Sequence, residues 1–87
     1  MLIPYCTIGN DIEVTQTPLD STGHTLVHIE VPDEVYCFKV MECLIPSYKV
    51  SNVIGMTNEE VSHYVDFCQH NAHLLLKYAK EGGIANA

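Results

Sequence analysis

The feature that most constrains this chain is an amphipathic pattern that runs from Thr57 to Lys80. Thr57 and Glu60 form the Thr-x-x-Glu pattern, in which two side chains satisfy free backbone amides of a first helical turn. Apolar side chains then recur at spacings of three and four residues and form one stripe along a helix. The members of this stripe are Val61, Val65, Cys68, Ala72, Leu75 and Ala79. The pattern therefore predicts one long C-terminal helix with a single apolar side.

The segment before Gly55 has the alternation of β-strands. Apolar and polar residues alternate over 12–17 and again over 24–31, and Pro32, Asp33 and Glu34 have the composition of a hairpin turn. Further strands are expected at 3–8 and 35–45, with a short extended piece at 48–53. Parallel strands would need crossover helices, which this pattern lacks. We therefore predict the α+β class, with one domain over 1–87. It is an antiparallel meander of three to four strands followed by one long helix packed on one sheet face.

The segment from Val35 to Ile45 is apolar on both of its sides, although one helix covers only one face of a sheet. An apolar face left in water is costly and usually marks an interface. A domain of 87 residues is also marginal alone, which favours support by oligomerisation. We therefore predict a homodimer or a complex with another protein. The interface candidates are Val35, Cys37, Met41, Cys43 and Ile45.

The charge of the chain excludes several classes of partner. Four lysines, no arginine and 11 acidic residues give a formal net charge of -7. Such a chain lacks the cationic face that binds nucleic acid directly or an anionic membrane surface. No stretch approaches the roughly 20 apolar residues of a membrane span, and residues 1–10 lack the pattern of a signal peptide. We expect a cytoplasmic protein with no membrane partner.

The four cysteines, Cys6, Cys37, Cys43 and Cys68, include no Cys-x-x-Cys pair. Without such a pair a zinc ribbon is not expected, and without a secretion signal a disulfide framework is not expected. Each cysteine lies among apolar neighbours, and we predict buried, reduced thiols that pack as small hydrophobic side chains.

Five histidines are the remaining candidates for chemistry. His70 and His73 stand three residues apart on the expected helix, so their rings can share a side and bind a transition metal. Ordinary surface histidines are the alternative. On the strand expected at 24–31, His24, His28 and Glu30 share one side. A histidine beside a carboxylate can act as a general base or as a pH sensor. A merely polar outer strand face is the alternative.

Patterns of nucleophilic catalysis and of phosphate binding are missing from the sequence. It contains no Gly-x-Ser-x-Gly elbow, no Gly-rich phosphate loop and no Walker pattern. Cys68 lies on the apolar stripe of the helix, where a buried thiol is inert. We therefore predict no catalytic residue and no cofactor.

The chain resembles a family of short bacterial proteins that is catalogued as a domain of unknown function. Members begin Met-Pro-x-Ile, carry a Pro-His-Val-His-Val segment on a strand, and end in a helix opened by Ser/Thr-x-x-Glu. The matching segments are 1–4 (Met-Leu-Ile-Pro), 27–31 (Val-His-Ile-Glu-Val) and 54–60 (Ile-Gly-Met-Thr-Asn-Glu-Glu), together with Gly9, Asn71 and 74–76 (Leu-Leu-Leu). Glu30 stands where the family has its second histidine, and Val27 where it has the proline. The resemblance implies a partner in a small two-gene, toxin–antitoxin-like module.

Two main classes of function follow. The first is a small acidic module that docks another protein and has no catalysis. The second is a small metal-dependent or histidine-based enzyme that uses the histidine cluster. A third is an acidic inhibitor that imitates nucleic acid, which would require the carboxylates to gather on one face.

Overall fold

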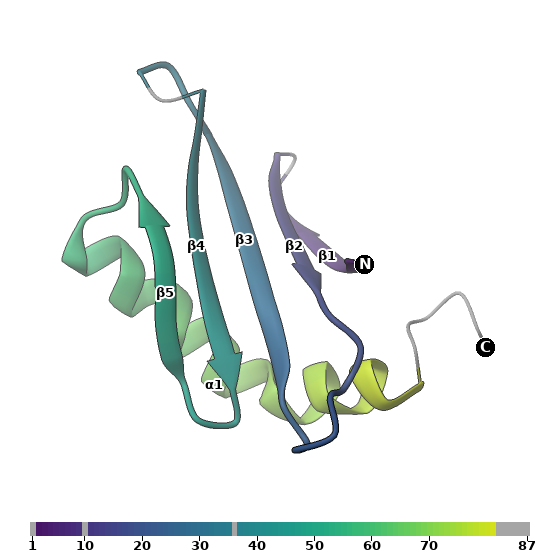
Figure 1. Ribbon diagram of the computed structural model, residues 1–87. Helices are drawn as coiled ribbons and strands as arrows, with labels where there is room; N and C mark the ends of the chain where they lie inside the picture. Colours follow the sequence, from purple (N-terminus) through teal and green to yellow (C-terminus); the bar gives the residue numbers. More distant parts are fainter. Residues whose placement is uncertain (1, 10, 36, 82–87) are drawn as a thin grey trace.

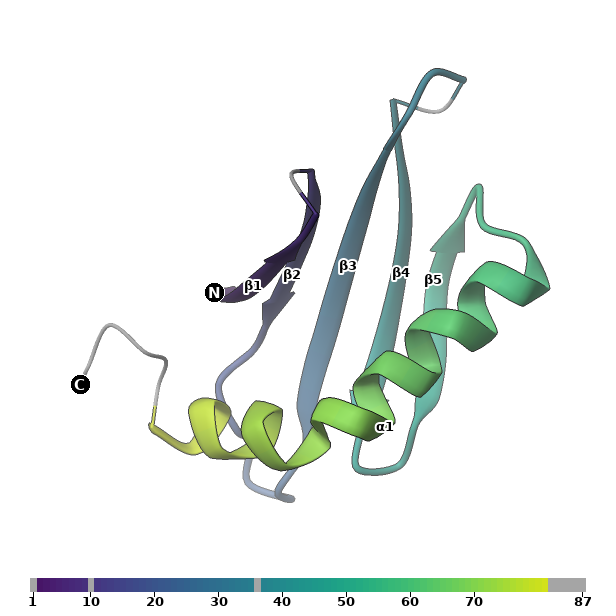
Figure 2. The ribbon, with the colours of Figure 1, turned by 180° about the vertical axis from the view of Figure 1, so that it is seen from behind.

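The computed structural model describes residues 2–9, 11–35 and 37–81, and in them a sheet lies against one helix (Figure 1). The five strands follow in the order β1-β2-β3-β4-β5, and each is antiparallel to its neighbour. Their bounds are Ile3–Ile8 (β1), Ile12–Gln16 (β2), Thr25–Asp33 (β3), Cys37–Ile45 (β4) and Lys49–Ile54 (β5). Helix α1 spans Asn58–Glu81 and crosses one face of the sheet, as the reverse view in Figure 2 shows. The α+β class and the meander are confirmed, but the strand count of three to four is wrong. The correct count is five, because the short piece at 49–54 also pairs with β4.

The helix begins at the predicted capping pattern. The amide of Thr57 donates to Glu60 Oε1 at 3.0 Å, and the amide of Glu60 donates to Thr57 Oγ1 at 3.2 Å. The two side chains thus satisfy two backbone donors reciprocally. The buried residues of α1 are Tyr64, Cys68, Leu75 and Ala79. The stripe predicted from the sequence is therefore the side that packs on the sheet.

The core lies between α1 and one face of the three inner strands. The sheet contributes Val14, Val27, Ile29, Met41, Cys43 and Ile45, and the helix contributes Tyr64, Cys68 and Leu75. Gln16 is also fully buried, and its Nε2 donates to the carbonyl of Leu75 at 3.0 Å. Near the β1 edge, Tyr5 donates its hydroxyl hydrogen to Asn71 Oδ1 at 2.9 Å and tethers β1 to the helix.

Three of the five interface candidates lie in this core. Met41, Cys43 and Ile45 are completely buried beneath α1, so they present no surface to a partner. Val35 lies in the turn after β3 with 82% of its surface exposed, and Cys37 is exposed at the start of β4. The prediction therefore chose the wrong face of the strand. The reason is that both faces of β4 are apolar, and the helix covers the face that β4 shares with Val27 and Ile29.

The hairpin between β3 and β4 also differs from the prediction. The composition of 32–34 predicts a turn, but Pro32 lies within β3 and pairs with Phe38, while Asp33 pairs with Cys37. The pairing of β2 with β3 ends at Glu13 and Glu30, so β3 is an edge strand beyond that point. A proline is tolerated on such an edge because its missing N–H removes no ladder hydrogen bond.

All four cysteines are free, but only two match the prediction of buried thiols. Cys43 and Cys68, the buried thiol pair, lie in the core, where a hydrogen bond with Cys43 and burial raise the pKa of Cys68. Cys6 and Cys37, the exposed thiol pair, lie on the surface. Cys6 lies in the edge strand β1, and Cys37 is the first residue of β4.

Candidate docking face

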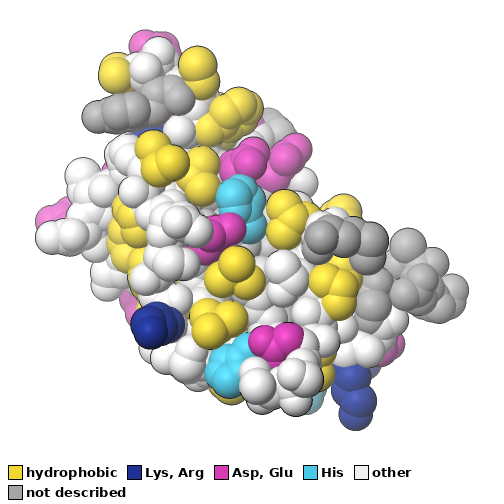
Figure 3. Space-filling view, viewed as in Figure 1, with side chains coloured by type: hydrophobic (Ala, Val, Ile, Leu, Met, Phe, Trp, Pro, Cys, Tyr) yellow, Lys and Arg dark blue, Asp and Glu magenta, His cyan; other side chains and the backbone are white. Residues whose placement is uncertain are grey.

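The sheet face opposite α1, the open face, is the candidate site. Side chains alternate along each strand, so the residues between the core positions of β3 and β4 point to this face. By register it carries Leu26, His28, Glu30 and Pro32 from β3 and Phe38, Val40, Glu42 and Leu44 from β4. Among the described residues, no helix or further strand covers this face (Figures 1 and 3). It is therefore the part of the sheet available to another molecule.

Part of the open face is apolar. Val40 of β4 pairs directly with Ile54 of β5, and Phe38 stands two residues before Val40 on the same side. Phe38 is 50% exposed and Ile54 is 54% exposed. We call Phe38, Val40 and Ile54 the apolar patch. Contiguous apolar side chains on an uncovered surface are typical of interaction sites.

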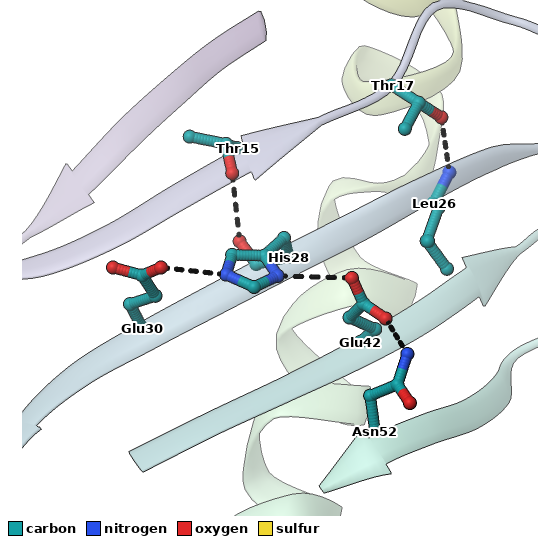
Figure 4. A network of polar contacts seen from close by, with 7 residues as sticks. All are labelled: Thr15, Thr17, Leu26, His28, Glu30, Glu42 and Asn52. Atoms are coloured by element: carbon teal, nitrogen blue, oxygen red, sulfur yellow. Dashed lines mark hydrogen bonds and ion pairs between the residues drawn. The ribbon is translucent and has the colours of Figure 1, made fainter. Parts of the chain in front are cut away.

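A row of hydrogen-bonded polar side chains crosses the centre of the open face (Figure 4). His28 Nε2 lies 2.9 Å from Glu30 Oε1, and His28 Nδ1 lies 3.2 Å from Glu42 Oε2. The amide of Asn52 on β5 donates to the other carboxylate oxygen of Glu42. We call Glu30, His28, Glu42 and Asn52 the His28 belt. The belt joins β3, β4 and β5 (Figure 4), and Figure 3 shows that cyan, magenta and yellow side chains lie next to one another on this face.

The geometry of the belt favours a protonated histidine. An ionised carboxylate only accepts hydrogen bonds, so two ionised glutamates that face the two ring nitrogens favour the imidazolium form of His28, in which both nitrogens donate. Burial of the ring lowers the pKa of His28, but the hydrogen bonds to Glu30 and Glu42 outweigh it, and the net pKa is raised. The hydrogen bond from Asn52 is the main cause that lowers the pKa of Glu42, and His28 adds to it. The belt thus favours a positive histidine between two carboxylates, with the Asn52 amide as a further donor at its end.

This arrangement gives little scope for histidine chemistry. A general base needs a ring nitrogen with a free lone pair, and both nitrogens of His28 are engaged. The two carboxylates bind opposite ends of the ring, so they do not converge on a common point with it. Within 2–9, 11–35 and 37–81, no group of three or more His, Cys, Asp or Glu could hold a metal ion. The belt is therefore a hydrogen-bonded polar row in the middle of the open face.

The other predicted site residues lie elsewhere. His24 precedes β3, and its Nδ1 lies 2.9 Å from Thr22 Oγ1 rather than near His28. On α1, His70 Nδ1 donates to the carbonyl of Asp66 at 2.8 Å. His73 lines a shallow hollow between α1 and the β2–β3 loop, together with Leu19, Gly23, Leu76, Lys77 and Lys80. The structure therefore brings together His28 and Glu30 but not His24, and gives His70 and His73 separate surroundings.

Sequence reasoning missed Glu42 and Asn52. The signal for Glu42 was present, because it is the one carboxylate inside the apolar run of β4. A turn placed at 32–34 does not bring Glu42 opposite His28, whereas the observed pairing of Asp33 with Cys37 does. Asn52 stands at an irregular point of β5 with a positive φ of 52, which no alternation pattern could locate.

Both outer strands of the sheet are irregular. The β1–β2 register shifts between Pro4 and Cys6, and the β4–β5 register shifts opposite Val40 and Glu42. Bulges and prolines on edge strands hinder pairing with a strand of another chain. The sheet edges are therefore poor docking sites compared with the open face.

The carboxylates do not gather on a single face. Glu30 and Glu42 belong to the open face, whereas Glu59 and Asp66 are exposed on α1 in the opposite layer. This distribution does not fit an imitation of nucleic acid by one acidic surface.

Comparison with known proteins identifies no relative. No family model matches the chain, and no curated protein or solved structure is similar enough to count as a match. Of the helical residues that the structure describes, none belongs to a segment both long and apolar enough to cross a membrane.

Proposed function

We propose that this chain is a small acidic protein–protein interaction module, without a catalytic site, that docks its partner on the open face. The observation that carries the proposal is the apolar patch beside the His28 belt on a sheet face that no described element covers. An exposed apolar patch next to fully paired polar groups is the usual composition of a protein interface. The cytoplasmic location and the toxin–antitoxin-like pairing belong to this proposal, and the latter rests on the family resemblance alone.

The sheet edges support docking by the face. Strand addition requires a regular edge with free backbone groups, and both outer strands carry a register shift. The open face instead presents ordered side chains from three neighbouring strands. A partner that packs on these side chains meets no irregular backbone.

The size of the apolar patch limits what it can do alone. Burying the exposed halves of Phe38 and Ile54 contributes about 1 kcal/mol each. A micromolar complex requires about 8 kcal/mol. The partner must therefore also contact the polar part of the open face, including the surroundings of the His28 belt.

The histidine-based or metal-dependent enzyme is the second class of function that the sequence allowed. No contact of the described residues favours it, because the two nitrogens of His28 are occupied and His70 and His73 have separate surroundings.

Three single variants test the docking face. Phe38→Ser and Ile54→Ser remove half-exposed apolar side chains from the patch, and Leu74→Ser removes one of similar exposure from α1. Association is measured by sedimentation velocity and by capture with tagged protein, with mass spectrometry identifying what is bound. We expect a complex that both patch variants weaken and Leu74→Ser leaves intact.

Two results would contradict the proposal. One is a complex that is equally sensitive to Leu74→Ser. The other is a chain that remains monomeric and captures nothing in any form.

A further inference from the structure

The open face carries two carboxylates that oppose each other across neighbouring strands. Glu13 of β2 pairs in register with Glu30 of β3. Like charges directly opposite each other in an antiparallel pair are destabilising. Glu30 accepts a hydrogen bond from His28, whose other nitrogen is engaged by Glu42. Glu13 is exposed. The opposed pair thus keeps carboxylate oxygens available at the surface of the open face.

The chain itself supplies few cations to neutralise this pair. It has four lysines and no arginine. Lys39 forms an ion pair with Glu60 at 2.5 Å on the helix side of the sheet, and Lys77 and Lys80 line the hollow beside α1. Lys49 lies on β5 and pairs in register with Leu44 of β4, and two strands, β3 and β4, separate it from Glu13 on β2.

This distribution of charge discriminates between two occupants of the open face. A second copy would bring another net charge of -7 and a second opposed pair of glutamates. A cationic protein would bring opposite charge to the same carboxylates, and opposite potentials favour and accelerate docking. An arginine fits better than a lysine, because its planar group can bond two carboxylate oxygens at once.

We infer that the partner of the open face is a basic protein segment that presents arginine and apolar side chains together to this face. Its guanidinium groups bind Glu13 and Glu30, and its apolar side chains pack on the apolar patch. This inference rests on the proposed function and names the kind of partner. In an extended segment, residues i and i+2 point to the same side, so arginine and apolar side chains at that spacing both reach the open face.

A short peptide probes this chemistry directly. The probe is a fluorescein-labelled peptide of sequence Arg-Ser-Leu-Ser-Arg-Ser-Leu, which places its arginines and leucines on one side, and its control has glutamine in place of each arginine. Binding is measured by fluorescence anisotropy with wild-type protein, with Glu13→Gln/Glu30→Gln, and with Glu59→Gln/Asp66→Asn. The two double variants have the same net charge, but only the first changes the open face. Glu13→Gln alone serves as a second variant, because no described contact of the His28 belt involves it.

The expected result is saturable binding of the arginine peptide that the open-face double variant weakens about tenfold. Glu13→Gln alone also weakens binding. The affinity of Glu59→Gln/Asp66→Asn for the peptide agrees with that of wild type within a factor of about two. The glutamine peptide binds more weakly to every form.

Two results would overturn the inference. If both double variants weaken binding equally, the peptide responds to net charge and not to these carboxylates. If the open-face double variant, without peptide, self-associates more strongly than wild type in sedimentation, the occupant is a second copy whose glutamates repel. Neither result removes the proposed function, because the effects of Phe38→Ser and Ile54→Ser test the open face itself.

Discussion

Replacing His28 by glutamine tests the charge that the structure assigns to the His28 belt. A glutamine amide can donate to one carboxylate, so the variant loses one of the two charge-assisted hydrogen bonds of the imidazolium. Such a bond contributes about 1.5–3 kcal/mol when buried. The side chain of Glu30 is 36% exposed, and solvent screening weakens its hydrogen bond. We therefore expect the free energy of unfolding to fall by about 1.5 kcal/mol, the lower limit of this range. For a domain of 87 residues this lowers the melting temperature by about 9 °C.

The same variant predicts how the stability depends on pH. The pKa of His28 is raised in the folded chain. The stabilising contribution of His28 is therefore fully present below its pKa in the unfolded chain, about 6.5. It is lost as the pH rises through its pKa in the folded chain. The free energy of unfolding of wild type should exceed that of His28→Gln at pH 6, and the difference should be smaller at about pH 9.

Urea denaturation followed by circular dichroism at these two pH values measures the difference. His63→Gln is the matched control, because His63 is exposed on α1 and touches no member of the belt. A difference that is equal at both pH values, or larger at the higher one, would refute the assignment of an imidazolium.

Three further predictions concern the helix and the cysteines. Thr57→Ala removes the hydroxyl that caps α1 and should lower the free energy of unfolding by about 1 kcal/mol in urea denaturation, whereas no change would contradict the capping role. Leu75→Ala leaves a cavity between α1 and the sheet and should lower the free energy of unfolding by about 2–5 kcal/mol in the same measurement. A smaller loss than that of Thr57→Ala would contradict the packing of Leu75 in the core. In the native protein, the exposed thiol pair should react with a disulfide reagent within minutes, and the buried thiol pair only after unfolding. Four fast thiols in a mass-spectrometric time course would contradict the burial of the second pair.

The helix and most strands could be predicted because their signals are local. The Thr57–Glu60 pattern and the spacing of apolar residues determine where α1 begins and which side it buries, independently of the rest of the fold. The alternation of β3 likewise separates Val27 and Ile29 from His28. By contrast, β5 lacks a regular alternation because its register shifts near Asn52, and this led to too low a strand count.

The choice of face could not be predicted from the same signals. Both sides of β4 are apolar, so the sequence does not say which one α1 covers, and Met41 was placed on the wrong side. The partner of His28 depended on the register of the β3–β4 hairpin. A small error in the position of the turn moves Glu42 away from His28, because register is a property of the paired strands and not of either strand alone.

The central claim is that the open face docks a protein partner, and methyl NMR spectroscopy tests it most directly. The chain is labelled at its Leu, Val and Ile methyl groups and titrated with the protein that it captures or, without one, with the arginine peptide. The account predicts that the methyl signals of Leu26, Val40 and Ile54 shift with the added partner while those of Leu74 on α1 stay in place. Shifts at Leu74 with unchanged signals on the open face would contradict it.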